Sequence, residues 1–424
     1  MTGPTKTMQA RKDLVDIDAE LRWTVAHAYQ GSTFFREHLD VAGATPDQIQ
    51  GLADLHRLPF TTKEQLRDHG PWGWTAVPME EVVRVHSSTG TTGRRTVCAY
   101  TADDLEAWTQ QLVRCMQYVG LTAVDRVQLA VGYGMWTAGI GFQAAAEKLG
   151  ALAIPTGPGN TELQLDAMLT LGTTALCATA SFSLLLAELI EAKGLREQLD
   201  LRVGITGSER WGEATRRRIE TKLGVETFDL YGLTELWGPG TGVECHRHDG
   251  MHVWSDHFLV EIIDPDTLQP LPEGQEGELV VTTFRKQATP LLRYRTRDLT
   301  RLLPGDCACG SPYPRIARLS GRTDDAIKVR GVMVLPAQVD LVLAEFGEQT
   351  SGEYQLHVAR DDGGRDELSL KVESDGPPAL AQGLAARLRT VTGLRFDVEL
   401  TEVGALPRSE RKTRRVFDHR DRKE

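Results

Sequence analysis

The chain has 424 residues, of which 41% are hydrophobic, with a net charge of −11 and a pI near 5.6. A chain of this length can bury a sizeable core and is expected to form at least two domains. Its negative charge argues against general nucleic-acid binding, which requires a positive surface facing the phosphates.

Membrane association and secretion are not expected. No stretch approaches the roughly 20 apolar residues that span a bilayer, and the opening residues MTGPTKTMQARKD contain no apolar signal region. Six cysteines in so long a chain do not make a disulfide framework. We therefore expect a reducing, cytoplasmic location.

The first 86 residues predict helices and turns around apolar positions such as Trp23, Phe34 and Leu39, with a helix-capping pattern from Thr61 to Asp68. Between about 127 and 230, short apolar runs alternate with helical segments. The apolar runs are VQLAVG, ALAIP, TALCAT, LRVGIT and VETFDLYG. This alternation predicts a parallel α/β sheet covered by helices, in which ligands bind at the carboxyl ends of the strands.

The second half of the chain no longer shows the regular alternation of apolar runs and helical segments. Residues 258–303 surround the turn-rich DPDTLQPLPEGQEG and predict β-hairpins. After GRTDD at 321–325, the order of apolar and helical runs predicts a small α+β domain of about 100 residues. We expect an α/β fold with a domain at 1–322 and a second at 323–424.

A glycine-rich loop stands early in the chain, and its residues suit phosphate binding. Glycine allows the backbone to approach a ligand, and hydroxyl groups bond phosphate oxygens. The loop consists of Ser87, Ser88, Thr89, Gly90, Thr91, Thr92 and Gly93. It lacks the spacing of a Walker loop. Taken alone, it could equally be a polar surface turn.

Other segments follow this loop in a fixed order, and together they carry a family resemblance. They are LPFTTKEQLRD, VRVHSSTGTTG, GPGNTE, DLYGLTELWGPG, DGMHVWSDHF, LLRYRTRDLTRLLPG, GRTDDAIKVRGVMVLPAQVD and LPRSERKTRRV. From about residue 20 to 418 the chain resembles the AMP-forming acyl-CoA synthetases, and among them the phenylacetate-CoA ligases. The resemblance implies a large N-terminal adenylate-forming domain with parallel sheets and a β-rich subdomain, followed by a small mobile α+β C-terminal domain.

The resemblance also implies a two-step reaction. A carboxylate attacks the α-phosphate of ATP to give an acyl-adenylate and pyrophosphate, and the thiol of coenzyme A then displaces AMP. Lys412 matches the catalytic lysine and Glu235 the ligand of Mg²⁺. The alternatives are a solvated charge for Lys412 and a helix-start glutamate for Glu235. The remaining implied ATP-binding residues are Gly207, Ser208, Glu209, Tyr231, Gly232, Thr234, Asp298 and Arg322. For Asp298 and Arg322, a structural ion pair is the alternative.

The C-terminal domain should rotate between the two steps. Asp324 matches the hinge position, with a simple interdomain turn as its alternative, and Gly331 matches the loop that leaves room for the pantetheine arm. The chain departs from the family pattern at two places. Arg94-Arg95 replaces the usual Lys-Pro, which keeps positive charge near the phosphates. Arg411 replaces a glycine beside Lys412 and puts the local backbone geometry there in question.

Two further sites are predicted. Four side chains on two loops suit structural zinc, namely Cys245, His252, Cys307 and Cys309, with His246 or His248 as rivals for the histidine ligand. The alternative is reduced surface cysteines and solvated histidines. The resemblance also implies an aryl-binding wall just after an apolar strand, formed by Tyr133, Met135, Trp136, Gly139 and Phe142, and aromatic walls bind a flat ring well. Trp136 and Phe142 could instead belong to the core.

The expected function is ATP-dependent ligation of an aromatic carboxylic acid to coenzyme A. One alternative keeps adenylation but delivers the acyl group to the pantetheine of a carrier protein or to an amine. A basic patch for the 3′-phosphate of CoA would favour free CoA. A second alternative is a non-catalytic adenylate-binding protein. The resemblance is compatible with a homodimer.

Overall fold

The computed structural model describes residues 15–88, 95–325, 327–330, 332–361, 365–408 and 414–420. The chain divides into two compact units, each built from two stretches. The first combines 1–157 with 228–319, and the second combines 158–227 with 320–424. The domain boundary predicted at 322/323 separates the chain differently and stays a prediction. None of the helices in the described ranges is long and apolar enough to cross a bilayer.

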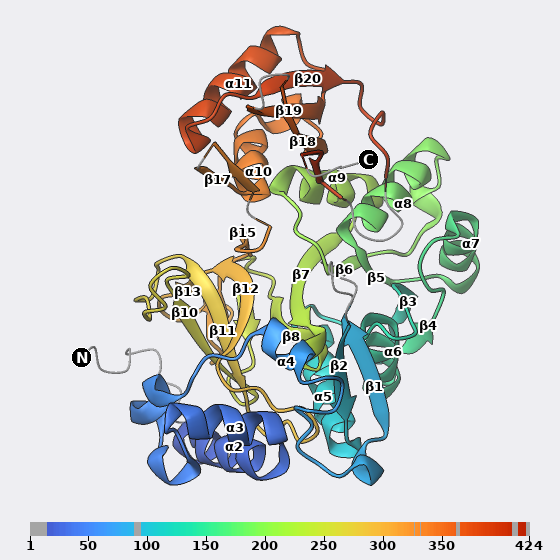
Figure 1. The fold of residues 1–424 in the computed structure, drawn as a ribbon. Coiled ribbons are helices and arrows are strands. Elements are labelled where there is room, and N and C mark those ends of the chain that lie inside the picture. Colours follow the sequence, from blue (N-terminus) through green and yellow to red (C-terminus); the bar gives the residue numbers. More distant parts are fainter. Residues whose placement is uncertain are drawn as a thin grey trace. The chain divides into compact units, whose positions relative to one another are not determined.

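The first unit contains an N-terminal helical region followed by most of the strands before residue 319 (Figure 1). Its helices are α2 (Ile17–Gly31), α3 (Thr33–Ala42), α4 (Lys63–Asp68), α5 (Ala102–Tyr118) and α6 (Ala138–Leu149). Its strands are β1 (Arg84–Ser88), β2 (Thr96–Tyr100), β3 (Arg126–Ala130), β4 (Leu152–Ile154), β7 (Glu226–Leu233), β8 (Gly238–Glu244), β9 (Met251–Val253), β10 (Phe258–Ile263), β11 (Gly277–Thr283), β12 (Tyr294–Thr300), β13 (Leu302–Leu303) and β14 (Arg315–Ile316).

From β3 onward, strand pairing in this unit changes from parallel to antiparallel along the chain, as the sequence pattern predicts. β3 and β4 are parallel, whereas β7, β8 and β9 form an antiparallel series that continues to β14 and β13. β10, β11 and β12 form the antiparallel hairpins predicted for 258–303. All seven residues of β11 are buried, and its one charged residue, Glu278, is paired with Arg295 at 2.7 Å.

The helix-capping pattern predicted from Thr61 to Asp68 is confirmed. The Thr62 hydroxyl accepts a hydrogen bond from the Gln65 amide, and the Gln65 side chain accepts one from the Thr62 amide, so the two form a capping box at the start of α4. Thr61 just before it pairs with β12: its amide donates to Arg293 O at 3.1 Å and its carbonyl accepts from the Arg295 amide at 2.9 Å. The first turn of α4 is therefore fixed against β12.

The second unit contains helices and strands from both of its stretches. Its helices are α7 (Thr161–Leu171), α8 (Ala180–Ala192), α9 (Glu213–Leu223), α10 (Pro336–Glu345) and α11 (Ala379–Thr392). Its strands are β5 (Ala175–Thr179), β6 (Val203–Gly207), β15 (Gly321–Arg322), β16 (Ile327–Val329), β17 (Val332–Val334), β18 (Tyr354–Arg360), β19 (Asp366–Glu373), β20 (Asp397–Thr401) and β21 (Val416–Asp418). β5 and β6 are parallel, as the alternating pattern predicts.

The C-terminal part of this unit is the predicted small α+β fold. Its sheet has the order β20-β19-β18-β21, and α10 and α11 lie beside each other (Figure 1). Leu380, Leu384 and Leu388 recur every four residues on α11 and are buried with Leu356 and Leu370 of the sheet. The predicted α/β class, with a small α+β region at the end of the chain, is confirmed.

Candidate functional site

Glu235 lies in a tight turn between β7 and β8. The turn is a single 3₁₀ segment, Thr234–Leu236, followed by Trp237 with a φ of 73°. The Tyr100 hydroxyl donates to Trp237 O at 2.6 Å and lies 3.2 Å from Thr234 O. A Cβ at Gly232 would stand 2.2 Å from Gly238 O, so only glycine permits this close approach of the two strands.

Two side chains hold the Glu235 carboxylate. Oε1 lies 2.9 Å from Lys63 Nζ and 2.8 Å from Ser88 Oγ, which donates to it. Glu235 is 2% exposed. Burial raises the pKa of Glu235, but Lys63 and Ser88 outweigh this effect, and the pKa lies below its usual value. The carboxylate is therefore ionised and already attracts a cation.

Lys63 is a site residue that the sequence did not reveal. It is the first residue of α4, whose start is fixed by the capping box and by the pairing of Thr61 with β12. A lysine in the first turn of a short helix is ordinarily solvated, so TTKEQLRD indicated only a helix start. The contact with Glu235 arises from two segments more than 170 residues apart.

Tyr231 and Asp298, both predicted to bind the nucleoside, are brought together. The Tyr231 hydroxyl donates to Asp298 Oδ2 at 2.7 Å, and both residues are buried. The Asp298 amide donates to Thr296 Oγ1 at 3.1 Å. Tyr231 is on β7 and Asp298 on β12, so this contact joins the turn that carries Glu235 to the strand that is paired with Thr61.

The beginning of the phosphate loop lies against the predicted acyl wall. The Ser87 amide donates to Met135 O at 2.9 Å, and Arg95 NH1 donates to Ser87 Oγ at 3.2 Å. Arg95 thus holds its positive charge at the loop, as expected for this departure from the family pattern. The predicted residues Thr89, Gly90, Thr91, Thr92, Gly93, Gly331 and Lys412 lie outside the described residues, as do Arg94 and Arg411.

The predicted acyl wall is an aromatic loop folded over glycines. A Cβ at Gly139 would stand 2.5 Å from the Tyr133 ring, and one at Gly132 would stand 2.6 Å from the Trp136 ring. Met135 is 42% exposed, whereas Phe142 of α6 is buried. The absent side chains at the two glycines leave room for both rings close to the backbone. Phe142 is therefore also a core residue.

The predicted adenine residues of the second unit follow β6. Ser208 has a φ of 71°, and Glu209 Oε1 accepts the Ser181 amide at 2.6 Å, at the first turn of α8. A carboxylate suits a helix N-terminus. Arg322, predicted to reach the ribose or phosphates, forms a two-pronged pair with Asp324 at 2.8 and 3.0 Å. The predicted hinge residue is thus paired locally with its neighbour.

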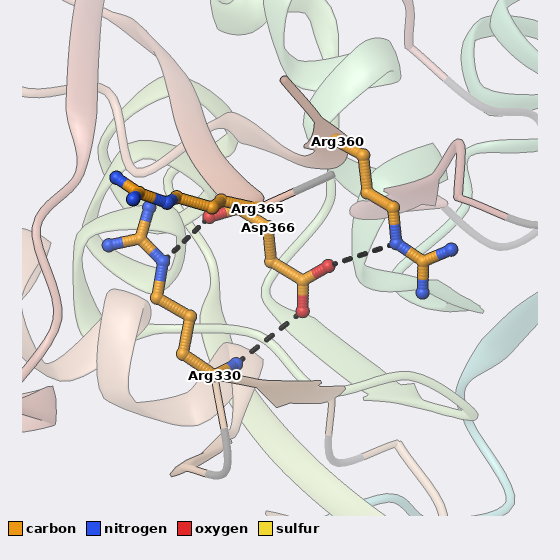
Figure 2. Close-up of a pocket in the computed structure, with 4 residues that line it drawn as sticks. All are labelled: Arg330, Arg360, Arg365 and Asp366. Carbon is orange, nitrogen blue, oxygen red and sulfur yellow. Dashed lines mark hydrogen bonds and ion pairs between the residues drawn. The ribbon is translucent and has the colours of Figure 1, made fainter. Parts of the chain in front are cut away.

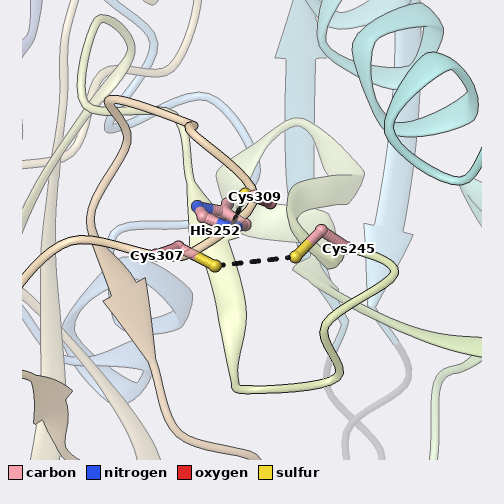
Figure 3. Close-up of side chains that lie close together, drawn as sticks. All are labelled: Cys245, His252, Cys307 and Cys309. Carbon is pink, nitrogen blue, oxygen red and sulfur yellow. Dashed lines mark hydrogen bonds between the residues drawn. The ribbon is translucent and has the colours of Figure 1, made fainter.

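The four predicted zinc ligands form one cluster, shown in Figure 3. Their ligand atoms all lie within 4.8 Å of one another, with 3.8 Å between the sulfurs of Cys245 and Cys307 and 3.3 Å between Cys309 Sγ and His252 Nε2. Two sulfurs at about 2.3 Å from a tetrahedral zinc would be about 3.8 Å apart. The donor set and spacing therefore fit such an ion.

His252 is the histidine of this cluster. Its Nδ1 lies 3.1 Å from Tyr313 O, which turns Nε2 toward Cys309, as a carbonyl partner typically orients a metal-binding imidazole. Of its two rivals, His246 is exposed, and His248 stacks on Phe228 and lies 3.4 Å from Glu244. The cluster does not include them.

Comparison with known proteins assigns the chain to a family. The model for the AMP-binding enzyme family matches residues 32–284, and the model for the AMP-binding enzyme C-terminal domain matches residues 331–420. A phenylacetate-coenzyme A ligase of Escherichia coli (strain K12) is 41% identical, with 95% of this chain and 93% of that protein covered. One of Pseudomonas putida is 42% identical, with 94% and 92% covered.

Solved structures give the same result. A 2-hydroxyisobutyryl-CoA ligase in the postadenylation state, in complex with 2-HIB-AMP, is 29% identical and has a TM-score of 0.86, with 95% of this chain and 89% of that chain covered. The two family models, the relatives and the matched fold identify an adenylate-forming enzyme. The chain belongs to the phenylacetate-CoA ligase family within the AMP-binding enzymes.

It is accordingly an AMP-forming acid–thiol ligase. ATP activates a carboxylic acid as an acyl-adenylate, and a thiol then takes the acyl group and releases AMP. The ligase function predicted from the sequence, ATP-dependent activation of a carboxylic acid followed by thioester formation, is confirmed by the relatives and by the acyl-CoA ligase structures.

Proposed function

We propose that the acid is aromatic and of the phenylacetate type. The observation that carries this proposal is the pair of rings, Tyr133 and Trp136, packed against Gly139 and Gly132 in the loop that contacts Ser87. Flat aromatic faces suit a flat ring in the substrate. The names of the relatives from Escherichia coli and Pseudomonas putida point to the same acid. A panel of aryl acids, compared by kcat/KM, tests this assignment.

The first half-reaction brings two anions together, and positive charge must offset their repulsion. A carboxylate oxygen of the acid attacks the α-phosphorus, a P–O bond forms, and pyrophosphate leaves with the electrons of the α–β bridge. In this proposal, Tyr231 and the residues 207–209 hold the adenine, while Asp298 and Arg322 hold the ribose. Ser87 and Ser88 begin the phosphate loop that continues to Gly93. Lys412 stabilises the transition state.

Glu235 is the proposed Mg²⁺ ligand. Its ionised carboxylate offers the hard oxygen donor that Mg²⁺ prefers, and Mg²⁺ would supply charge neutralisation at the phosphates. Lys63 holds Glu235 in this structure. Its ammonium, fixed by α4, can remain beside the carboxylate and add a positive charge toward the phosphates.

Zinc is proposed at the Cys245, His252, Cys307 and Cys309 cluster, where it would join two loops of the first unit. None of the six cysteines forms a disulfide, which supports the proposed cytoplasmic location. Residues 323–424 are proposed as the mobile domain, with Asp324 as hinge and Gly331 at the pantetheine arm.

Free coenzyme A, and not a carrier protein, is proposed as the acyl acceptor. A basic hollow in the second unit supports this choice. It has a volume of about 520 Å³ and is lined by Arg330, Arg360, Arg365 and Asp366, as Figure 2 shows. Three guanidinium groups against one carboxylate leave two positive charges in excess. Asp366 pairs with Arg360 at 3.5 Å and also with Arg420 at 2.9 Å, so its one carboxylate is shared and the hollow keeps an excess of positive charge that can attract an anion.

Arginine recognises phosphate by paired hydrogen bonds, and CoA carries a 3′-phosphate and a pyrophosphate that a carrier-bound pantetheine lacks. The hollow also includes Arg330, the residue before Gly331. We expect Arg360→Gln with Arg365→Gln to raise the KM for CoA about tenfold while leaving the KM for pantetheine and the rate of adenylation unchanged. An equal rise in the KM for pantetheine would show that the arginines do not act through the phosphates of CoA. Efficient acylation of a carrier protein would support the alternative acceptor.

A further inference from the structure

A closed ring of polar contacts lies in the second unit. Arg218 NH2 donates to Glu188 Oε1 at 2.6 Å, and Arg218 NH1 donates to Ser351 O at 3.0 Å. The Ser351 hydroxyl donates to Glu373 Oε2 at 3.0 Å. Arg408 closes the ring by donating to both carboxylates. Two arginines and two glutamates balance one another, so the ring carries no net charge.

Arg408 is the centre of this ring. Its guanidinium reaches the two oxygens of Glu373 at 2.8 Å each and the two oxygens of Glu188 at 3.1 and 3.2 Å. Arg408 is 8% exposed and Glu373 is fully buried, whereas Glu188 is 26% exposed. Charge-assisted bonds in such a shielded place are strong and directional.

The two carboxylates differ in the part of the chain to which they belong. Glu373 ends β19, in the same C-terminal stretch as Arg408. Glu188 is on α8, in the stretch 158–227. The pair of Glu188 with Arg408 therefore ties the C-terminal stretch to α8, whereas the pair with Glu373 remains within the C-terminal stretch.

Helix α8 connects the Glu188–Arg408 ion pair to Glu209, one of the residues predicted to bind adenine. At its first turn, the Ser181 amide donates to Glu209 at 2.6 Å. Glu188 follows seven residues later, about 10 Å along the helix axis. Arg408 stands four residues before Lys412 in the sequence. Helix α8 thus contacts Glu209 at its first turn and Arg408 about two turns further on.

We propose that Glu188 is a positioning residue for adenylation, which holds Arg408 and thereby ties the C-terminal stretch to α8, the helix whose first turn contacts Glu209. The inference rests on the proposed function, because only that function assigns Lys412 to adenylation and not to thioester formation. Glu188 itself touches no reacting atom. Its removal should therefore slow the first half-reaction and leave the second unchanged.

The test measures the two half-reactions separately in Glu188→Gln. Adenylation is followed by acid-dependent exchange of pyrophosphate into ATP, and thioester formation by a single turnover of supplied acyl-adenylate with CoA. We expect the exchange rate to fall about tenfold, as for the loss of one charge-assisted pair, and thioester formation to stay within about twofold. Glu188→Asp keeps the charge with a shorter reach and should give an intermediate exchange rate.

Glu191→Gln is the matched control. Glu191 lies on the same helix and pairs with Lys222 of α9, but it is exposed and has no contact with Arg408. Both of its half-reactions should match the wild type. Equal losses in the two half-reactions of Glu188→Gln, or no loss in either, would overturn the inference. If the wild type carried out neither half-reaction, the proposed function itself would fail, and this inference with it.

Discussion

Replacement of Lys63 by methionine would leave the buried carboxylate of Glu235 without its cation. The side chain of Met is close to that of Lys in length, so packing is largely retained, and the Ser88 hydroxyl still donates to Glu235. Removing one partner of a fully buried ion pair costs about 3–5 kcal/mol. Because the Lys63 side chain is 25% exposed, we expect a smaller loss in the free energy of unfolding, about 2 kcal/mol at pH 7.

The free energy of unfolding that Lys63→Met loses should increase as the pH rises. In the wild type the pKa of Glu235 is lowered in the folded state, so Glu235 adds stability above its unfolded pKa of about 4.3 and loses it as the pH falls through the folded value. Without Lys63, burial raises the pKa. The variant then loses stability as the pH rises through this raised value. The difference between the two proteins should be small near pH 4 and grow toward pH 7.

Urea unfolding at a series of pH values, followed by tryptophan fluorescence, measures this difference. Lys148→Met is the control, because Lys148 pairs with Glu106 at 2.6 Å on the surface of the same unit. Its loss should stay within about 0.5 kcal/mol at every pH. A loss for Lys63→Met that does not change with pH, or that equals the control, would refute the electrostatic reasoning.

Three other predictions concern the site. Lys412→Ala should abolish adenylation but spare conversion of supplied acyl-adenylate to thioester, and equal loss of both steps would remove its proposed role. Metal analysis after chelator-free purification should find about one zinc per chain, reduced in Cys309→Ser; a metal-free wild type would contradict the zinc proposal. Tyr231→Phe removes the donor to Asp298 while keeping the ring, and should raise the KM for ATP about fivefold with little change in kcat. An unchanged KM for ATP would show that the Tyr231–Asp298 hydrogen bond does not contribute to ATP binding.

Spacing in the sequence was sufficient to predict residues whose chemistry is carried by local motifs. The turn with Glu235 follows strand β7, and the four Cys and His ligands occur in two short stretches of sequence, so both could be recognised as patterns, although His252 lies in β9 and not in a loop. The capping box of α4 and the hairpins of 258–303 were predicted for the same reason.

Contacts between distant segments left no such pattern. Lys63 and Glu235 meet only because Thr61 pairs with β12, and Arg408 meets Glu188 across 220 residues. Arg322, predicted from the motif to face the nucleotide, is held by Asp324 two residues later. The joining of 158–227 with the C-terminal stretch into one compact unit likewise depends on packing and ion pairs that neither stretch shows alone.

Pyrophosphate release from ATP and Mg²⁺ with phenylacetate and a panel of related aryl acids, each with and without CoA, tests the central claim most directly. The account predicts release that turns over only when CoA is present, with an aryl-CoA product identified by mass. Sustained release without CoA, or transfer only to a carrier protein or an amine, would contradict free CoA as the acceptor. No release with any acid would contradict the ligase function itself.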